Sequence, residues 1–569
     1  MRKLLVLMAV FAAAIALWVG VTLPPKHLTL STPWSDRTIR GILHVHTNRS
    51  DGLSSPDVVA AAAARSGLAF VVFTDHGDAT RKPDPPTYRS GVLCLDAVEI
   101  STSGGHYIAI DMPAAPYPLG GEARDVVEDV RRLGGFGVVA HPDSPKPQLQ
   151  WREWTAPFDG IELVNPDTSW RVHRQQRGWR SKLRLLNAFV DYPFRSAEAL
   201  TSLEQRPEAT IVRWNALTER RRVVALAGAD AHAKVSLLNA DPGDNRFALP
   251  IPSYASTFRM LSVHVTADSP LSGDAASDGA TLVRALRAGH AYSALDGLAT
   301  PPAFEFSASN AHGTVYGGDE LGEGGPVTLR VRTNAPPEFT TVVHEGSRVL
   351  SGGHHEAGVA VQAPAAPAVY WAEVIASTRT PPIAWIVSNP IYVRADQSPR
   401  LPGRIPASAS TPMFDAQTSG GWQVEADPLS VAALDPPAAG GVAALRLRYG
   451  LGGGVPAGQY AALVLSTPAG IDGHDRLAFT VRAEHPMRIS LQLRAGEGPV
   501  GERWQRSVYV DAFDQERVVY FDELTPIGAT ATWRPNPATI RAILFVVDTT
   551  NTRPGSSGRL WISKAALQR

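Results

Sequence analysis

Cysteine is almost absent from this sequence: Cys94 is the only one, so no disulfide can form within the chain. Disulfides mark oxidising compartments, and a single cysteine therefore gives no information about the redox compartment. Cys94 lies in a mostly apolar run, residues 92–98, without a recognisable motif around it. We interpret it as a buried structural thiol rather than a nucleophile.

The sequence also lacks an excess of charge of either sign, since Lys plus Arg and Asp plus Glu both total 54. A non-specific nucleic-acid binder is normally basic, so no stable nucleic-acid complex is expected. One local basic cluster does occur, which is either the solvated face of a helix or a surface that steers an anionic substrate. Its members are Arg171, Arg174, Arg177, Arg180, Lys182 and Arg184.

Charge is missing altogether from residues 4–23, an apolar run that follows Arg2 and Lys3 and precedes two prolines. A run of this length can span a bilayer as a helix, and flanking basic residues stay on the cytoplasmic side. Residues 1–25 are therefore predicted to be a signal anchor that binds the chain to the membrane. A cleaved signal peptide is the alternative. In either case the rest of the chain lies outside the cytoplasm, in the periplasm or at the cell surface.

The length of 569 residues is too great for one hydrophobic core, because single cores stop growing at roughly 250–300 residues. Between residues 37 and 300, apolar strand-like runs alternate with helical segments that begin at caps and prolines and end at glycines. This alternation predicts an α/β barrel or a doubly wound sheet. One of the last expected strands covers residues 259–265. Residues 166–222 are expected to be a long helical insertion rich in Trp and Arg.

The character of the chain changes after residue 300. Residues 301–395 hold short strand-like runs between Gly, Pro and Asn turns, which predicts an immunoglobulin-like β-sandwich. Residues 396–412 are rich in Pro and Ser and are interpreted as a linker. Residues 413–569 again form an all-β pattern, typical of a jelly roll or a galactose-binding-like β-sandwich that binds a glycan. Its tryptophans expected in the core are Trp422, Trp504 and Trp561.

The string from His44 to Gly52 reads His-Val-His-Thr-Asn-Arg-Ser-Asp-Gly and follows an apolar strand-like run. His44 and His46 are two positions apart, so on a strand both imidazoles point to the same face. Asp51 follows in a turn closed by Gly52, near enough to join them. A single His-x-His pair is a weak signal, but the whole string after a strand is much more specific.

Side chains of the metal-binding type recur near the ends of other apolar runs further down the chain. In a parallel barrel the carboxyl ends of the strands meet at one rim, where active sites are built. Charged and imidazole groups need partners when they are buried, and metal ions are such partners. The predicted metal ligands are His44, His46, Asp51, His76, Glu99, His106, His141, Asp230 and His232.

These successive motifs resemble those of the polymerase-and-histidinol-phosphatase (PHP) family, over roughly residues 37–300. The resemblance implies an α/β fold, a distorted (β/α)7 TIM-like barrel, with two or three divalent metal ions at its rim. It also implies that His44, His46, Glu99 and His141 hold one pair of metal positions, that Glu99 bridges them, and that the other ligands complete the cluster. The motif Gly-Ala-Asp-Ala-His departs from the Gly-Ser-Asp-Ala-His of many relatives at a position that is not a ligand. Residues 385–392 resemble the end of a β-domain that follows PHP barrels in secreted or membrane-tethered relatives.

A ligand set of mixed nitrogen and oxygen, rich in imidazole, suits Zn, Mn or Fe. Two close metal ions make a hydroxide from bound water near neutral pH and hold the oxygens of a phosphoryl group. We therefore predict a metal-dependent phosphoesterase that hydrolyses a phosphorylated small molecule or nucleotide by metal-bound hydroxide. The predicted catalytic residues are Asp230, Glu99 and His76, with Asp230 as a proton acceptor. The candidates for phosphate contact, chosen by their position near the insertion, are Lys146, Arg171, Arg174 and Arg177.

Two other functions fit the same sequence. One is a PHP-type metallohydrolase of a non-phosphate ester or amide-like bond, which an apolar pocket would favour, whereas cations aimed at the metals would favour phosphate. The other is a protein that chiefly binds a glycan or the cell envelope. Near the site, Glu162 and Asn165 either line the pocket or make structural hydrogen bonds. Asp75 is predicted to orient the imidazole of the neighbouring His76.

Overall fold

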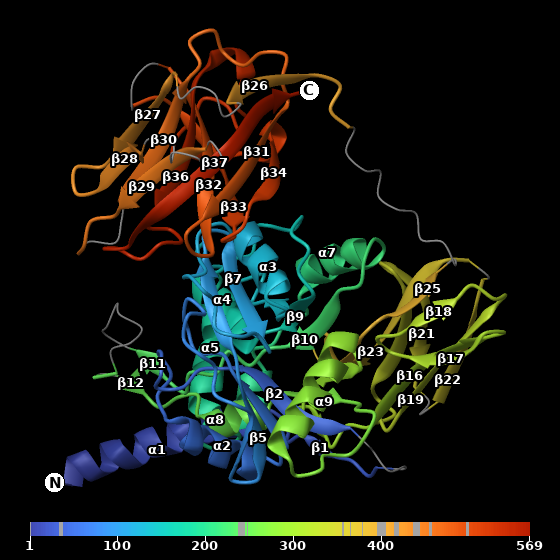
Figure 1. Ribbon diagram of the computed structural model, residues 1–569. Coiled ribbons are helices and arrows are strands. Elements are labelled where there is room, and N and C mark those ends of the chain that lie inside the picture. Colours follow the sequence, from blue (N-terminus) through green and yellow to red (C-terminus); the bar gives the residue numbers. More distant parts are fainter. Residues whose placement is uncertain are drawn as a thin grey trace. The chain divides into compact units, whose positions relative to one another are not determined.

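The computed structural model describes residues 2–32, 38–236, 245–246, 248–355, 358–364, 366–377, 379, 381–394, 406–414, 420–435, 444–454, 458–496 and 500–569 (Figure 1). The chain divides into two compact units. The first comprises residues 1–77, 81–113 and 122–399, and the second comprises residues 78–80, 114–121 and 400–569. Most of the predicted linker, 396–412, lies outside the described residues.

The first unit begins with helix α1 (Arg2–Thr22), whose composition is almost entirely apolar. Its stretch Lys3–Thr22 has a mean hydropathy of 2.7 and is long and apolar enough to cross a membrane. A signal sequence at an N-terminus has the same properties, so the helix suits a signal anchor or a signal peptide. Its C-terminal part packs against α5 (Trp179–Asp191).

Two sheets carry the residues of interest in the first unit (Figure 1). In the first, three strands lie parallel, namely β2 (Ile39–Val45), β3 (Phe70–Phe73) and β5 (Val92–Asp96). The second has the order β10-β9-β8-β7-β6. Its strands are β6 (Val98–Thr102), β7 (Gly105–Ile110), β8 (Phe136–Val139), β9 (Gly160–Val164) and β10 (Val224–Ala227).

Both edges of the second sheet are joined to the first sheet. Isolated parallel bridges link Val45 to Ala231 and His76 to Glu99. Around the first bridge, the amide of Ala231 donates to the carbonyl of His44 at 3.2 Å and the amide of His46 donates to the carbonyl of Ala231 at 3.1 Å. The chain just beyond β2, β3 and β10 therefore meets β6 in one region. A complete (β/α)7 TIM-like barrel remains a prediction, because β7 is antiparallel to both of its neighbours.

Helices α2, α3 and α9 begin and end close to their sequence signals. Helix α2 (Pro56–Arg65) follows Ser55 and has proline at its first position, α3 (Ala123–Arg132) precedes two glycines, and α9 (Ala275–Ala288) ends at Gly289 with φ 74°. Glycine adopts this left-handed conformation without a Cβ penalty. Each of these helices buries one face, which is what their apolar spacing predicts.

The insertion at residues 166–222 is helical, as predicted. It holds α4 (Pro166–Gln175), α5, α6 (Ser196–Thr201) and α7 (Glu208–Thr218). The strand expected over residues 259–265 is partly wrong, because α8 (Tyr254–Phe258) precedes it and β13 (Ser262–Val265) begins only at residue 262. Ser253 starts α8, since its hydroxyl accepts from the amide of Ser256 at 3.2 Å.

Strands from residues beyond 300 continue the first sheet. Strand β14 (Ala291–Ala294) pairs with β13 on one side and with β24 (Ile383–Ser388) on the other. The predicted boundary at residue 300 therefore does not separate two compact units. The other elements of this region are β15 (Ala299–Thr300), β16 (Phe304–Asn310), β17 (Gly313–Tyr316), β18 (Glu320–Gly322), β19 (Val327–Thr333), β20 (Thr340–Glu345), β21 (Arg348–His354), β22 (Gly358–Ala363), β23 (Ala368–Ala376) and β25 (Ile391–Arg394).

Asn389, just after β24, fastens this region to the second sheet. Its side-chain oxygen accepts from the amide of Ala225 at 2.7 Å, and its side-chain nitrogen donates to the carbonyls of Ala225 at 3.0 Å and Ala291 at 2.9 Å. The side chain thus satisfies backbone groups of β10 that would otherwise be buried without partners.

The second unit is all-β, with two antiparallel six-stranded sheets. One contains β26 (Ser410–Phe414), β28 (Val431–Asp435), β29 (Leu445–Gly450), β31 (Arg476–Ala483), β34 (Gln515–Tyr520) and β37 (Ser557–Gln568). The other contains β27 (Trp422–Ala426), β30 (Tyr460–Ser466), β32 (Met487–Ala495), β33 (Arg503–Val510), β35 (Thr525–Ile527) and β36 (Ile540–Asp548). Apolar side chains from both sheets form one core, among them Leu447, Phe479 and Phe545. Trp422 and Trp504 are buried there, whereas Trp561 is half-buried beneath the guanidinium of Arg482.

Candidate metal centre

The structure gathers the predicted ligands in one place, where the sheet of β2, β3 and β5 meets the sheet of β6 to β10. Their side chains form overlapping groups whose ligand atoms lie within 4.8 Å of one another. The groups are His46, Asp51, His76 and His232; His44, Glu99 and His141; His44, His46 and Asp230; and His76, Glu99 and His106.

One ligand reaches this region in a way that the sequence reasoning did not foresee. His106 stands at the beginning of β7, whereas His44 and His46 stand at the end of β2. Because β7 is antiparallel to β6 and β8, its beginning lies at the edge where the parallel strands end. His106 therefore reaches the cluster from the beginning of its strand rather than from a carboxyl end.

Glu99 lies at the middle of the cluster and is 1% exposed. One carboxylate oxygen, Oε2, faces three imidazoles, and the other, Oε1, faces two more. The distances from Oε2 are 3.2 Å to His44 Nε2, 3.1 Å to His46 Nε2 and 3.3 Å to His76 Nδ1. Those from Oε1 are 2.7 Å to His106 Nδ1 and 3.0 Å to His141 Nε2. Glu99 thus belongs to two of the candidate ligand groups, and its role as a bridge between metal ions stays a prediction.

The contacts of the two ring nitrogens of His46 show whether the cluster suits metal ions. Both of its ring nitrogens are buried and neither has a hydrogen-bond partner among the described residues. Yet Nε2 is 3.1 Å from Glu99 and Nδ1 is 3.5 Å from Asp51. Two ligand atoms that each lie about 2.1 Å from one metal ion are roughly 3.0 to 3.4 Å apart. The spacing suits shared coordination, and a metal ion would satisfy nitrogens that no hydrogen bond satisfies.

The charges of the cluster favour cations. Burial lowers the pKa of His46, but the nearby carboxylates of Asp230 and Glu99 outweigh that effect and raise it to about 9. Burial raises the pKa of Glu99, but the facing imidazoles, His44 foremost, hold it well below its ordinary value. The carboxylates are therefore ionised and attract positive charge. Protons on the imidazoles supply this charge when no metal ion is bound, and divalent ions supply it when they bind.

A second layer of polar residues orients these ligands, and Glu162 is its main member. Its Oε1 accepts from His44 Nδ1 at 2.6 Å, and its Oε2 accepts from the amide of His141 at 2.7 Å and from Asn165 Nδ2 at 2.9 Å. The bond to Nδ1 leaves Nε2 of His44 facing the cluster. A Cβ at Gly228 would lie 1.7 Å from Glu162 Oε1, so glycine leaves the room that this carboxylate needs.

Asp75 does not perform the task predicted for it. Its carboxylate accepts from the amide of Thr47 at 2.8 Å, from the hydroxyl of Thr47 at 2.7 Å and from the hydroxyl of Ser50 at 2.7 Å. Consecutive side chains of an extended segment point in opposite directions, so Asp75 faces away from the ring of His76. It holds instead the turn that carries Asp51.

Several ligands stand on left-handed backbone. The φ angles are 61° at His44, 29° at His141 and 47° at Asp230, and the register of β2 shifts between Ile42 and Val45. The convergence of His44 and His46 therefore depends on this irregularity rather than on the simple alternation expected for a strand. Non-glycine residues with positive φ are strained, and such strain gathers at functional sites.

The cluster forms one end of a cavity of about 1180 Å³. Lys146, Arg171 and Arg174 line it, whereas Arg177 is exposed and is not among its lining residues. Arg171 forms an ion pair with Asp167, but Lys146 and Arg174 have no carboxylate partner among the described residues. Burial, and then the nearby Arg171, lowers the pKa of Lys146.

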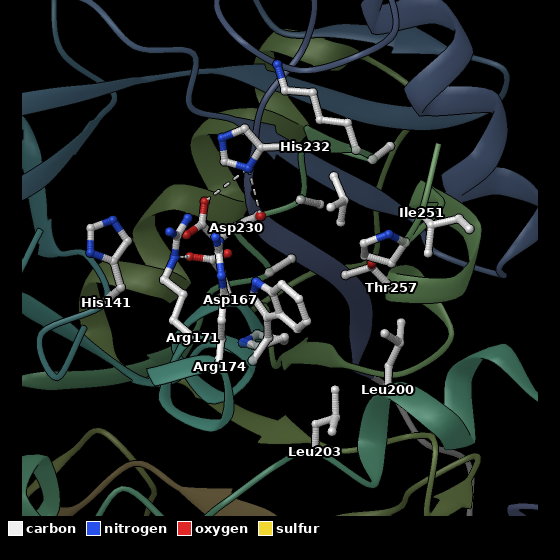
Figure 2. Close-up of a pocket in the computed structure, with 18 of the residues that line it drawn as sticks. His141, Asp167, Arg171, Arg174, Leu200, Leu203, Asp230, His232, Ile251 and Thr257 are labelled. Carbon is white, nitrogen blue, oxygen red and sulfur yellow. Dashed lines mark hydrogen bonds and ion pairs between the residues drawn. The ribbon is translucent and has the colours of Figure 1, made fainter. Parts of the chain in front are cut away.

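Many residues in the rest of the cavity wall are apolar, although Glu204, Tyr192, Lys234 and Thr257 also line it. Figure 2 shows Leu200, Leu203 and Ile251 apart from the charged side chains that gather near Asp230 and His232. The cavity thus has a charged end and an apolar end. Phosphate and hydrocarbon can each find a matching surface in it.

No family model matches the chain. An uncharacterized protein of Methanocaldococcus jannaschii, MJ1587, is 27% identical over 140 residues, which are 22% of this chain and 80% of that protein. A two-domain protein from Bacteroides vulgatus, described as containing a predicted PHP-like metal-dependent phosphoesterase, aligns with 61% of this chain and 94% of its own at 15% identity, with a TM-score of 0.27. A family 11 carbohydrate-binding module from Clostridium thermocellum aligns with 28% of this chain and 94% of its own at 14% identity, with a TM-score of 0.24.

Proposed function

We propose that the chain is a metal-dependent phosphoesterase that hydrolyses a phosphorylated small molecule or nucleotide outside the cytoplasm. The observation that carries this proposal is the arrangement of imidazoles around the carboxylate of Glu99, at the cationic end of one cavity. Two or three divalent ions of the Zn, Mn or Fe type, bound there, would activate water and neutralise the charge of a phosphoryl group.

The residues would divide the work as follows. Because the ligand groups overlap at His44, His46, His76 and Glu99, they suit two or three ions rather than one ion for each group. His76, Glu99 and Asp230 line the cavity and therefore face the reacting atoms. Asp230 Oδ1 lies 3.4 Å from His44 Nε2 and 3.5 Å from His46 Nε2, so it would help these imidazoles to hold a metal ion. We assign to it the acceptance of a proton from the attacking water.

We assign phosphate binding to Lys146 and Arg174. Both line the cavity without a carboxylate partner in the described part of the chain, so both can pair with a dianionic ester. Arg171 already pairs with Asp167 and would mainly orient that carboxylate. Arg177, exposed and away from the cavity lining, has no such role in the proposal.

The apolar end of the cavity favours a second candidate, the hydrolysis of a carboxylic or carbamate ester or an amide-like bond. The wall of Leu200, Leu203 and Ile251 would accept the neutral part of such a substrate. Cations at the metal end favour phosphate, since a neutral ester leaves them without a partner. The two candidates are therefore distinguished by measuring which product is released, phosphate or a carboxylic or carbamic acid.

A glycan-binding role for the second unit is also a proposal. Along β32, Arg488, Ser490, Gln492 and Arg494 alternate with Ile489, Leu491 and Leu493, and all seven residues are buried. One face of this strand is therefore polar, which matches the chemistry of sugar hydroxyls. Binding of soluble glycans to the full chain, measured by calorimetry, tests the role, and no binding across neutral and charged glycans would contradict it.

The test of the enzymatic proposal compares the full chain with the double variant His44→Ala, His46→Ala and with His485→Ala, an exposed histidine in the second unit. Metal content is measured together with the release of phosphate from a panel of phosphoesters. We expect at least two ions per chain and phosphate release in the full chain and the control, with both lost in the double variant. A metal-loaded protein that is inert on phosphoesters but cleaves carboxylic esters would select the second candidate.

A further inference from the structure

The apolar end of the cavity is built largely by one face of α5. Leu185, Ala188, Phe189 and Tyr192 line it, at spacings of three and four that place them on one side of the helix. Phe189 lines the cavity and is also 61% exposed. It therefore stands at the mouth, where the apolar wall opens to the surroundings.

The membrane-type helix α1 touches α5 beside this mouth. The indole nitrogen of Trp18 donates to Asn187 Oδ1 at 3.1 Å, and the hydroxyl of Thr22 donates to Asp191 Oδ1 at 3.1 Å. Asn187 and Asp191 are four residues apart and occupy the side of α5 next to the cavity face. Trp18 and Thr22 lie at the C-terminal end of the apolar stretch, where a spanning helix leaves the hydrocarbon and tryptophan is favoured.

The surface around α5 has the composition of a membrane-contacting surface. Besides Phe189, large apolar side chains are exposed at Trp179 (70%), Leu186 (47%) and Phe194 (61%). Arg180 and Lys182 are exposed on the same helix. Exposed apolar residues among basic ones are typical of helices that lie in the headgroup region of an anionic bilayer.

From these observations we propose that the cavity takes an amphiphilic phosphoester, a lipid with a phosphate headgroup, directly from the bilayer. The phosphate enters the charged end, and the hydrocarbon chain lies along the α5 wall and leaves past Phe189. Hydrolysis adds one water molecule and breaks one phosphorus–oxygen ester bond, which yields an alcohol and a phosphate. The inference rests on the proposed function and names its substrate class.

The first experiment uses the full chain in lipid nanodiscs with ethyl, butyl and hexyl phosphate, which stay monomeric in water. Each methylene that an apolar wall covers improves binding about fourfold at full burial. We expect kcat/KM to rise at least tenfold from the ethyl to the hexyl ester. A ratio near one would overturn the inference while leaving the phosphoesterase proposal intact.

Variants of α5 test whether its apolar side chains cause the preference for the hexyl ester. The double substitution Leu185→Ser, Phe189→Ser is expected to lower the hexyl-to-ethyl ratio at least fivefold. Val212→Ser serves as the matched control, because Val212 is exposed on α7 and is not among the residues that line the cavity. An unchanged ratio in the double variant would refute the assignment of the hydrocarbon to α5.

A binding measurement separates this inference from the proposed function. Hexylphosphonate and ethylphosphonate are not hydrolysed, and calorimetry gives their affinities for the full chain even if no ester is cleaved. A hexyl preference of tenfold or more supports the apolar wall, and equal affinities overturn it. The lipid source is tested by phosphate release from phosphatidate in the same nanodisc, and release slower than from hexyl phosphate would overturn delivery from the bilayer.

Discussion

Replacing Glu162 with glutamine tests whether the buried layer behind the ligands controls metal binding. The carboxylate receives three donors on two oxygens, namely His44 Nδ1, the amide of His141 and Asn165 Nδ2. Glutamine has the same shape but offers one oxygen and an NH₂ group. Because all three partners donate, the NH₂ group must face at least one donor, and that hydrogen bond is lost.

The size of the effect follows from this mismatch. A buried donor left without a partner destabilises the folded state by about 1–3 kcal/mol. The imidazole of His44 loses the acceptor that fixes its orientation, and loss of such a contact typically weakens metal binding about 10- to 100-fold. We therefore expect Glu162→Gln to bind Zn or Mn at least tenfold more weakly and to regain activity when metal is added in excess.

The assay is a competition titration of metal-free full chain against a chelator, with urea unfolding in parallel. Glu516→Gln is the control, because this glutamate is exposed on β34 of the second unit. Metal affinity within twofold of the unchanged chain would show that Glu162 is dispensable and would refute the orienting role.

Other predictions concern neighbouring groups. Gly228→Ala would place a Cβ 1.7 Å from Glu162 Oε1, and we expect a loss of about 1–3 kcal/mol in urea unfolding together with weaker metal binding; unchanged unfolding would contradict the packing. Glu99→Gln removes a charge shared by two ligand groups, so metal analysis should find at least one ion fewer per chain, and full occupancy would argue against bridging. Burial raises the pKa of Glu204 from 4.5 to about 7, so the stability that its neutral form provides is present below pH 4.5 and is lost as pH rises through 7. The stability advantage of Glu204→Gln should therefore grow by about 2–3 kcal/mol from pH 5 to pH 8 in urea unfolding, and a constant difference would contradict the shift.

Much of the candidate site could be predicted because its ligands carry local signals. Histidines and carboxylates next to apolar runs, as at His44 and Glu99, are rare unless they have a function. Glu162 had a weaker signal, a carboxylate inside an apolar strand, and its partner His44 is 118 positions away. Nothing local distinguishes an orienting carboxylate from one that lines a pocket. Arg177 was expected to contact phosphate only from its position near the insertion, but α4 ends at Gln175 and Arg177 is not among the residues that line the cavity.

The fold shows the same division between local and distant information. The start of α2 after Ser55 and the end of α9 at Gly289 are each signalled by a few adjacent residues, and the structure has both at these positions. Strand pairing depends on contacts between distant segments. The antiparallel direction of β7 and the pairing of β14 with β24 have no local signal, so the orientation at His106 and the continuity across residue 300 could not be predicted.

That continuity means that the part of the chain that carries the candidate metal centre cannot be separated at residue 300. A fragment cut at residue 300 would leave β14 with a bare edge where β24 now pairs, and the amide of Ala225 would lose the oxygen of Asn389. Exposed strand edges invite association between chains, so such a fragment is expected to aggregate. The shortest autonomous piece of the first unit must extend to Arg394, the end of its last strand. A gene fusion or domain exchange that leaves out residues 301–394 is therefore expected to disrupt the candidate metal centre.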